Sequence, residues 1–112
     1  MFRATTPTYT FLFDTDPDAT FKEVLVTYAQ NGQVILNKRK EDLTFSNGTD
    51  LDGNVTYLAS VQLSQQETNL FKTKNCSKVT VQVRVLTNDG KAFAFDKMTV
   101  SLQDVLNDEV LE

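Results

Sequence analysis

The chain has no histidine or tryptophan, and among its 112 residues it contains one cysteine, two prolines and four glycines. With Cys76 alone, no intrachain disulfide can form, and without histidine the usual zinc ligand sets and a histidine-based catalytic triad are excluded. A nucleophilic thiolate also needs a base beside it, so we interpret Cys76 as an unpaired structural residue from a reducing compartment. The sequence therefore predicts a protein that is not an enzyme, with no catalytic residue, metal site or cofactor.

Long apolar runs and basic stretches are missing as well. No run of about 18 apolar residues occurs, so we expect no membrane-spanning segment, and the start Met1-Phe2-Arg3 is followed by threonines and a proline instead of a signal-peptide core. The net charge is −4, and the basic run at 38–40 is followed at once by Glu41 and Asp42. We therefore expect no binding to nucleic acid or membrane.

Strict alternation of apolar and polar residues is what the sequence does have. The stretch 78–87 places valine at positions 79, 81, 83 and 85 between polar residues, which predicts a strand with one buried face. Similar patterns predict further strands at 8–13, 22–29, 33–38, 42–45 and 55–63, and a last one after Gly90. About seven short strands and no long amphipathic helix predict one domain over 1–112, an all-β, antiparallel, immunoglobulin-like β-sandwich; a small barrel is the alternative. Residues 1–7 form a lead-in, and 103–112 form an acidic, apolar tail.

The first predicted hairpin surrounds Gln30-Asn31-Gly32, and two registers fit its sequence. A two-residue loop sets Tyr28 opposite Ile35. A three-residue loop with Gly32 in the left-handed region sets Tyr28 opposite Val34, and Val26 opposite Leu36. The second register pairs apolar with apolar side chains along one face, so we favour it.

The second predicted hairpin turns at Asn88-Asp89-Gly90, which sets Val85 opposite Phe93 and Val83 opposite Phe95. After Phe95 the apolar positions change from odd to even numbers, at Met98, Val100 and Leu102. One extra residue at Asp96-Lys97 would return these apolar side chains to the same face of the sheet as Phe93 and Phe95. We therefore predict a β-bulge there, with Val81 opposite Met98 and Val79 opposite Val100.

A capping box, Ser64-Gln65-Gln66-Glu67, predicts one short helical turn at about 65–70. Leu70 and Phe71 are then expected to close this turn onto the core. The polar segments 14–20 and 46–54 are predicted to be turns and loops. The stretches that start at Asp14 and at Asp50 resemble the start of a calcium loop, but both lack glycine at the sixth place and glutamate at the twelfth.

The aromatic residues of the strands, Tyr9, Phe11, Tyr28, Phe45 and Tyr57, are better explained by core packing than by a sugar-binding platform.

Two other surfaces are candidates for interaction. On the outward face of the 78–87 strand, Gln82 and Arg84 are candidates, since an arginine on a sheet face can bind a carboxylate; a plain surface arginine is the alternative. The tail supplies the other candidates, Val105, Leu106, Val110 and Leu111, which we expect to pack on a neighbour or form a helical turn.

Several stretches together resemble one family. They are Thr5-Thr6-Pro7-Thr8-Tyr9-Thr10-Phe11, Val26-Thr27-Tyr28-Ala29-Gln30-Asn31-Gly32, Leu63-Ser64-Gln65-Gln66-Glu67-Thr68, Val81-Gln82-Val83-Arg84-Val85 and Leu106-Asn107-Asp108-Glu109-Val110-Leu111. The chain is similar in these to small proteins encoded by phages and prophages of Gram-positive gut bacteria, among the virion structural genes, although segments 14–20 and 46–54 are longer than that family leads us to expect.

The resemblance implies a non-enzymatic protein of the tail or baseplate region, made in the bacterial cytoplasm and located in the virion. Its expected partners are other virion proteins or further copies of itself. The alternative function is a carbohydrate- or cell-surface-binding module, which the tyrosine and aspartate content of the turns suggests.

Overall fold

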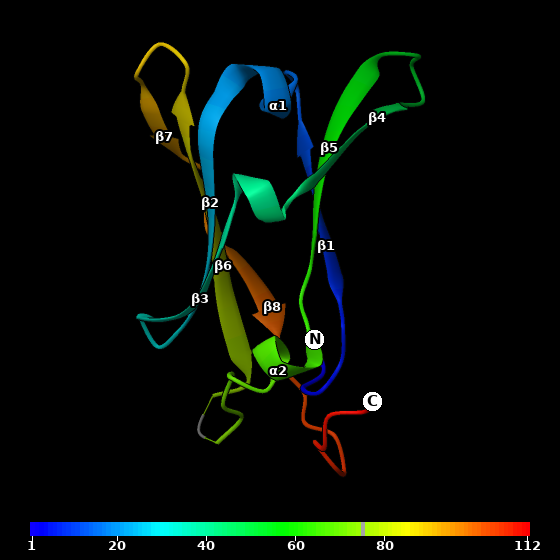
Figure 1. The fold of residues 1–112 in the computed structure, drawn as a ribbon, viewed down its shortest axis with the longest axis vertical. Helices are drawn as coiled ribbons and strands as arrows, with labels where there is room; N and C mark the ends of the chain where they lie inside the picture. Colours follow the sequence, from blue (N-terminus) through cyan, green and yellow to red (C-terminus); the bar gives the residue numbers. More distant parts are fainter. Residues whose placement is uncertain (75) are drawn as a thin grey trace.

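Eight strands contain about half of the residues in the computed structural model, which describes residues 1–74 and 76–112 (Figure 1). Three short helical segments, α1 (Pro17–Thr20), η1 (Lys40–Asp42) and α2 (Gln65–Thr68), join them. No helix in these described ranges has the length and apolar character needed to cross a membrane. The strands are β1 (Thr8–Phe13), β2 (Phe21–Gln30), β3 (Gln33–Arg39), β4 (Thr44–Thr49), β5 (Val55–Gln62), β6 (Lys78–Thr87), β7 (Ala92–Ala94) and β8 (Met98–Ser101).

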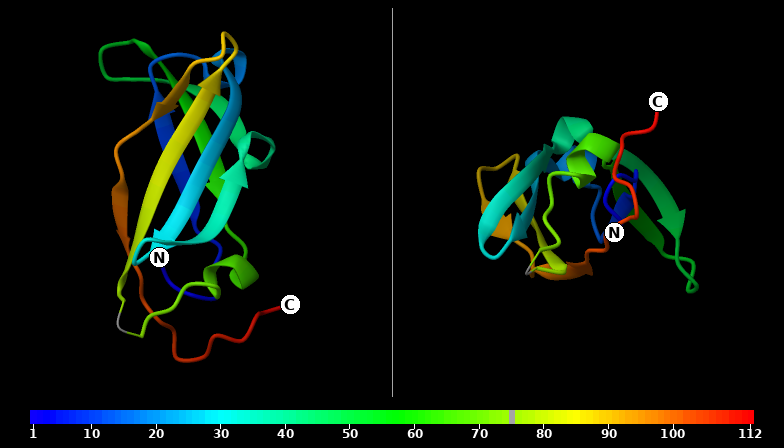
Figure 2. Two further views of the ribbon diagram at one scale, coloured as in Figure 1. Left: turned by 90° about the vertical axis from the view of Figure 1, so that its left-hand side faces the viewer. Right: turned by 90° about the horizontal axis from the view of Figure 1, so that it is seen from below.

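The strands form two antiparallel sheets that face each other, so the predicted all-β sandwich is confirmed (Figure 2). The smaller sheet has the order β1-β5-β4, and the larger has the order β3-β2-β6-β7, with β8 also paired to β6. In immunoglobulin constant domains the second strand lies in the ABED sheet and the third in the CFG sheet, whereas here β2 and β3 pair in one sheet. The likeness to immunoglobulin domains is therefore one of architecture and not of strand order.

The core lies between the sheets and follows the alternation of β6. Val79, Val81, Val83 and Val85 are all buried, as their pattern predicts. From the facing sheet, β5 and the residue after it contribute Ala59, Val61 and Leu63. Burial of a side chain of this size contributes about 1.5–3 kcal/mol, so this layer of alternating residues is what holds the two sheets together.

The first hairpin has the two-residue loop of the alternative prediction, but beyond Ala29 its pairing differs from both predicted registers. Gln30 pairs with Gln33, so the loop is the two-residue Asn31-Gly32. Their φ angles of 51° and 77° are those of a type I′ turn, whose twist matches the flanking strands. The register then shifts between Tyr28 and Ala29, which puts Tyr28 opposite Leu36.

The favoured pairs Tyr28–Val34 and Val26–Leu36 are thus wrong, because Ala29 pairs with Val34 and Val26 with Lys38. The pair Tyr28–Ile35 of the alternative register is wrong too. A bulge opposite Tyr28 supplies the one-residue shift that lets the tight turn and the apolar pair Tyr28–Leu36 coexist.

The second hairpin agrees with its prediction. Val85 pairs with Phe93 in β7, and the Phe95 N–H donates to the Val83 carbonyl at 2.9 Å. Val81 then pairs with Met98 in β8. The register with β6 therefore shifts by one residue between β7 and β8, as the predicted bulge at Asp96-Lys97 requires. Gly90 has a φ of 88°, the left-handed conformation that the loop requires.

The capping box of α2 is formed as predicted. Ser64 Oγ accepts from the Glu67 N–H at 3.1 Å, and Glu67 Oε1 accepts from the Ser64 N–H at 2.9 Å. The other carboxylate oxygen of Glu67 lies 2.6 Å from Lys38 Nζ, which ties α2 to β3. Burial raises the pKa of Glu67, but Lys38 and the Ser64 N–H outweigh it, so the pKa is lowered.

The residues after α2 confirm the predicted closure in part. Phe71 is completely buried beneath the sandwich. Leu70 is 50% exposed, so the prediction that it packs in the core is wrong. The helix ends at Thr68, earlier than the expected position 70, and the direction of the chain beyond it turns Phe71 rather than Leu70 inward.

The polar segment 46–54 is shorter as a loop than predicted. β4 runs from Thr44 to Thr49 because its backbone pairs with β5 along its whole length, from Thr44–Ser60 to Thr49–Val55. The loop begins at Asp50, whose carboxylate accepts from the N–H groups of Asp52 and Asn54, both at 2.9 Å. In the segment 14–20, Asp16 caps α1.

Both chain termini lie together at one end of the sandwich (Figure 1). Phe2 forms a parallel bridge to Gln103, and the Arg3 N–H donates to the Gln103 carbonyl at 3.0 Å. The Arg3 guanidinium contacts Asp104 at 3.0 Å and Asp108 at 2.9 Å. The tail residues 103–112 are extended or irregular, so the helical turn considered for them does not form.

Candidate functional site

The side of the sandwich between β1 and the β7–β8 edge carries exposed apolar side chains. Leu12 is 71% exposed, Phe95 43% and Met98 41%. Together with their neighbours they line a hollow of 220 Å³ that reaches Val83 of the core. We call this hollow the seam groove; its lining residues are Thr10, Phe11, Leu12, Phe13, Val83, Phe95, Asp96 and Met98.

The seam groove exists because neither bordering strand has a partner on this side. β1 pairs only with β5, and β7 and β8 pair only with β6. At one end the rings of Phe13 and Phe95 meet edge to face, with centroids 5.7 Å apart. At the other end the pairing of Phe2 with Gln103 closes the seam. Between these two contacts, no strand pairing among the described residues joins the two sheets on this side.

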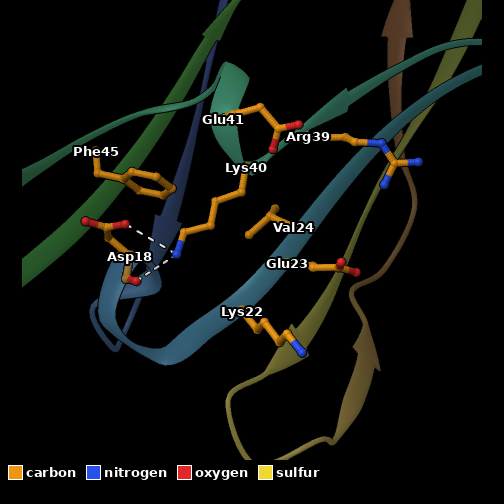
Figure 3. A pocket seen from close by; sticks show the side chains of 8 residues that line it. All are labelled: Asp18, Lys22, Glu23, Val24, Arg39, Lys40, Glu41 and Phe45. Carbon is orange, nitrogen blue, oxygen red and sulfur yellow. Dashed lines mark hydrogen bonds and ion pairs between the residues drawn. The ribbon is translucent and has the colours of Figure 1, made fainter.

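A second, charged pocket of 360 Å³ lies beside α1 and η1 (Figure 3). Lys40 Nζ donates to the carbonyl oxygens of Asp18 at 2.9 Å and Phe21 at 2.8 Å, and lies 3.4 Å from the Asp18 carboxylate. Lys40 is therefore engaged in holding η1 to α1 and β2. The other lining residues are Lys22, Glu23, Val24, Arg39, Glu41 and Phe45, which offer charges of both signs to a polar ligand.

Arg84 and Gln82 lie on the outer face of the larger sheet, as predicted. Arg84 is exposed, and the strand registers place it in one row with Leu25 and Arg39. These residues border a shallow hollow of 210 Å³ that also includes Glu23. Gln82 has a structural contact, since its Nε2 donates to the Phe95 carbonyl at 3.0 Å and so holds the segment between β7 and β8.

The four apolar tail candidates divide into two kinds. Val105 and Val110 are half-buried against the chain's own residues, while Leu106 and Leu111 are exposed. The backbone of Leu111 is held by Gln65, whose side chain both accepts from its N–H at 2.7 Å and donates to its carbonyl at 2.9 Å. The interaction role of the tail stays a prediction.

The aromatic residues considered for a sugar platform are mostly core residues. Tyr28 is fully buried, and Tyr9, Phe11 and Phe45 pack against the core, whereas Tyr57 is half-buried outside it. Burial raises the pKa of Tyr9 above its ordinary value. Within residues 1–74 and 76–112, no three Asp, Glu or Cys side chains gather closely enough to hold a metal ion.

Sequence reasoning missed the seam groove. Phe95 and Met98 were placed on the core face of the last strand, and they do face that way, but no strand of the described chain covers them. One signal was available: β1 has no charged residue between Thr8 and Phe13, and sheet edges that must stay unpaired usually carry charge.

Comparison with known proteins adds no relative. No protein-family model matches the chain, and no curated protein matches it.

Proposed function

We propose that this chain is a non-enzymatic assembly protein of a phage or prophage particle, in the tail or baseplate region, and that it joins other virion proteins or copies of itself. The observation that carries the proposal is the seam groove. Three apolar side chains, Leu12, Phe95 and Met98, are exposed around a sheet edge that has no partner in the described chain.

The physical argument is that such an edge favours association. An unpaired edge presents N–H and C=O groups to any extended segment, and natural sheets protect such edges when no partner is meant to bind. Full burial of one large apolar side chain contributes about 1.5–3 kcal/mol. Since the three side chains are 41–71% exposed, covering each contributes roughly 1 kcal/mol, in addition to the backbone hydrogen bonds.

The setting in a virion is supported by the resemblance to proteins of phage structural regions. The test is to purify particles of the phage or prophage that encodes the chain by gradient centrifugation and to count its copies per particle by quantitative mass spectrometry. A fixed copy number is expected. Particles that are complete and infective without the chain would refute the proposal.

The role of the seam groove in assembly is tested separately. Leu12→Lys places a charge in the groove and is expected to lower the copy number per particle. Val34→Lys is the matched control, because Val34 is an apolar residue that is 54% exposed and lies on β3, at the edge of the larger sheet away from the groove. Equal incorporation of both variants would show that assembly uses another surface.

A second candidate function is binding of a carbohydrate or cell surface, which the charged pocket favours. Phe45 and several charged groups line it, and aromatic and charged groups together suit a sugar. Glycan-array binding that falls with Glu23→Gln, but not with Asp52→Asn in the 50–54 loop, would support this function. An array without signal would count against it.

A further inference from the structure

We propose that β1 pairs with β1 of a second copy of this chain, antiparallel and about a two-fold axis beside Thr10. This pairing joins the two smaller sheets, three strands from each copy, into one continuous sheet. The inference rests on the proposed function and deepens it by naming the first partner as the chain itself.

The hydrogen bonds to β5 decide which groups of β1 are free. The Pro7 carbonyl accepts from the Leu63 N–H at 3.0 Å, and the register continues with Thr8 opposite Gln62. Because bonded and non-bonded pairs alternate in an antiparallel ladder, the odd-numbered residues of β1 bond to β5. The N–H and C=O groups of Thr8, Thr10 and Leu12 therefore point to the seam side, where no described residue makes a backbone hydrogen bond with them.

These three residues are spaced symmetrically about Thr10. If Thr10 lies opposite Thr10 of the second copy, Thr8 lies opposite Leu12 and Leu12 opposite Thr8. Every free group of the strand is then used, in about six backbone hydrogen bonds. A shift of the register by two residues would place Thr8 opposite Asp14, which follows the end of β1, so the two-fold at Thr10 is the register that strand residues alone complete.

The charge pattern fits a second copy of the same strand. A two-fold axis brings a strand against itself, so any charge near its centre meets its own like charge. β1 carries no charge. Both edges of the larger sheet do carry charge, since β3 ends in Lys38 and Arg39, and Asp96 and Lys97 interrupt the β7–β8 edge; β4 is uncharged like β1 but does not border the apolar seam groove.

The same register continues the apolar layers. On the inner side of the sheet, Tyr9 lies opposite Phe11 of the second copy, a cross-strand aromatic pair that adds to the backbone bonds. On the outer side, Leu12 is covered by its neighbours in the joined sheet. Phe95 and Met98 line the groove beside β1, so they lie next to the incoming strand and lose their exposure.

Charge substitution at Thr10 tests the pairing. Thr10 is exposed, and its one side-chain hydrogen bond in the described structure is between its Oγ1 and Ser60 Oγ, at 3.0 Å. Thr10→Lys and Thr10→Glu, each alone, place like charges opposite each other and are expected to raise the dimer Kd at least about tenfold. An equimolar mixture of the two restores the dimer, because the opposite charges now face each other.

The matched control is Thr44→Lys. The registers Thr10–Ser60 and Thr44–Ser60 place both threonines in one row across the smaller sheet, and Thr44 is likewise exposed but on β4, at the far edge. This variant is expected to remain a dimer. Mass is measured by light scattering from micromolar to millimolar concentration, with circular dichroism to check that each variant is folded.

Cross-linking tests the register itself. In a Cys76→Ser background, Thr10→Cys is expected to link to its own copy through a short thiol cross-linker. Thr8→Cys alone is not expected to cross-link, because Thr8 of one copy and Thr8 of the other lie roughly 14 Å apart along the strands. A mixture of Thr8→Cys with Leu12→Cys is expected to cross-link. Links in any other pattern would overturn the register.

The outcomes separate this inference from the proposed function. A wild-type chain that stays monomeric at every concentration, or a dimer that Thr10→Lys leaves intact, overturns the β1 pairing even if the chain is found in particles. A dimer that behaves as expected, from a chain that particles do not contain, leaves the pairing in place and refutes the virion role.

Discussion

Replacing Tyr28 with phenylalanine is predicted to stabilise the protein. Tyr28 is fully buried, and its hydroxyl has no hydrogen-bond partner among the described residues. Its ring packs edge to face against Tyr9, with centroids 5.8 Å apart, and against Phe71, at 6.1 Å. Phenylalanine keeps both ring contacts and removes only the hydroxyl, so the variant isolates the cost of burying that group.

The expected gain follows from the desolvation of an unpaired hydroxyl. Leaving a buried donor or acceptor without a partner costs about 1–3 kcal/mol, and the small void left by the oxygen takes back part of it. We expect the free energy of unfolding to rise by about 1–2 kcal/mol. For a domain of this size, that raises Tm by roughly 4–8 °C.

The pH dependence gives an independent check. Burial, followed by the nearby Tyr9 and Glu67, raises the pKa of Tyr28 well above its ordinary value. The folded chain therefore keeps a proton that the unfolded chain releases above about pH 10. Folding stability is therefore unaffected by this titration below about pH 10 and falls as the pH rises above it. The wild type should thus lose more stability in alkali than Tyr28→Phe.

Urea unfolding at neutral pH and at about pH 10.5 measures both effects. Tyr57→Phe is the control, because Tyr57 is a half-buried tyrosine outside the core cluster, and a change near zero is expected for it. If Tyr28→Phe lowers the stability at neutral pH by 1 kcal/mol or more, the hydroxyl has a hydrogen-bond partner in solution and the reasoning is refuted.

Three further predictions concern the end of the sandwich that holds α2 and the termini. Ser64→Ala removes the N-cap and should cost about 1 kcal/mol in urea unfolding, with Ser64→Thr close to wild type; equal losses would contradict the capping role. Phe71→Ala should cost about 3–5 kcal/mol by calorimetry, since Phe71 is fully buried; a loss under 1 kcal/mol would mean that the site collapses around the alanine. Arg3→Gln should speed amide exchange at 104–111. Wild type should show the same in acid, because Arg3 lowers the pKa of Asp104 below the ordinary value of 3.8. The Arg3–Asp104 contact is therefore fully present above pH 3.8 and is lost as the pH falls through the lowered pKa of Asp104. Exchange rates that Arg3→Gln leaves unchanged would show that two other contacts suffice to hold the tail: those of Gln65 with the Leu111 backbone, and the hydrogen bond that Asn69 Nδ2 donates to the Asp108 carbonyl at 2.9 Å.

The two hairpins show how far sequence reasoning reached and where it stopped. The bulge at Asp96-Lys97 was predictable because the apolar positions change parity there, and only an inserted residue reconciles them. The bulge opposite Tyr28 left no such trace, since Val34, Ile35 and Leu36 are all apolar. Three apolar residues in a row are compatible with every register, so apolar matching could not choose: the tight Asn31-Gly32 turn sets the pairing as far as Ala29–Val34, and the bulge sets it beyond.

The candidate site was harder to predict for a related reason. Alternation shows which face a side chain is on, but not whether another strand covers that face. Phe95 and Met98 fit the core pattern and are nevertheless over two-fifths exposed, because none of the strands formed by residues 1–74 and 76–112 lies between β1 and β8. Coverage depends on the order of strands in space, which the local pattern does not contain.

The contacts of the tail bear on which surface assembles. Leu106 and Leu111 are exposed, which favours the tail as a docking element. Yet Arg3 binds Asp104 and Asp108, and Gln65 binds the backbone of Leu111, so the tail must leave its own chain before it can extend onto another. β1 needs no such release, because its free N–H and C=O groups already face the seam. Of the two surfaces, the β1 edge is the one that would need no conformational change to pair with a partner, so we expect it to form the first contact in assembly.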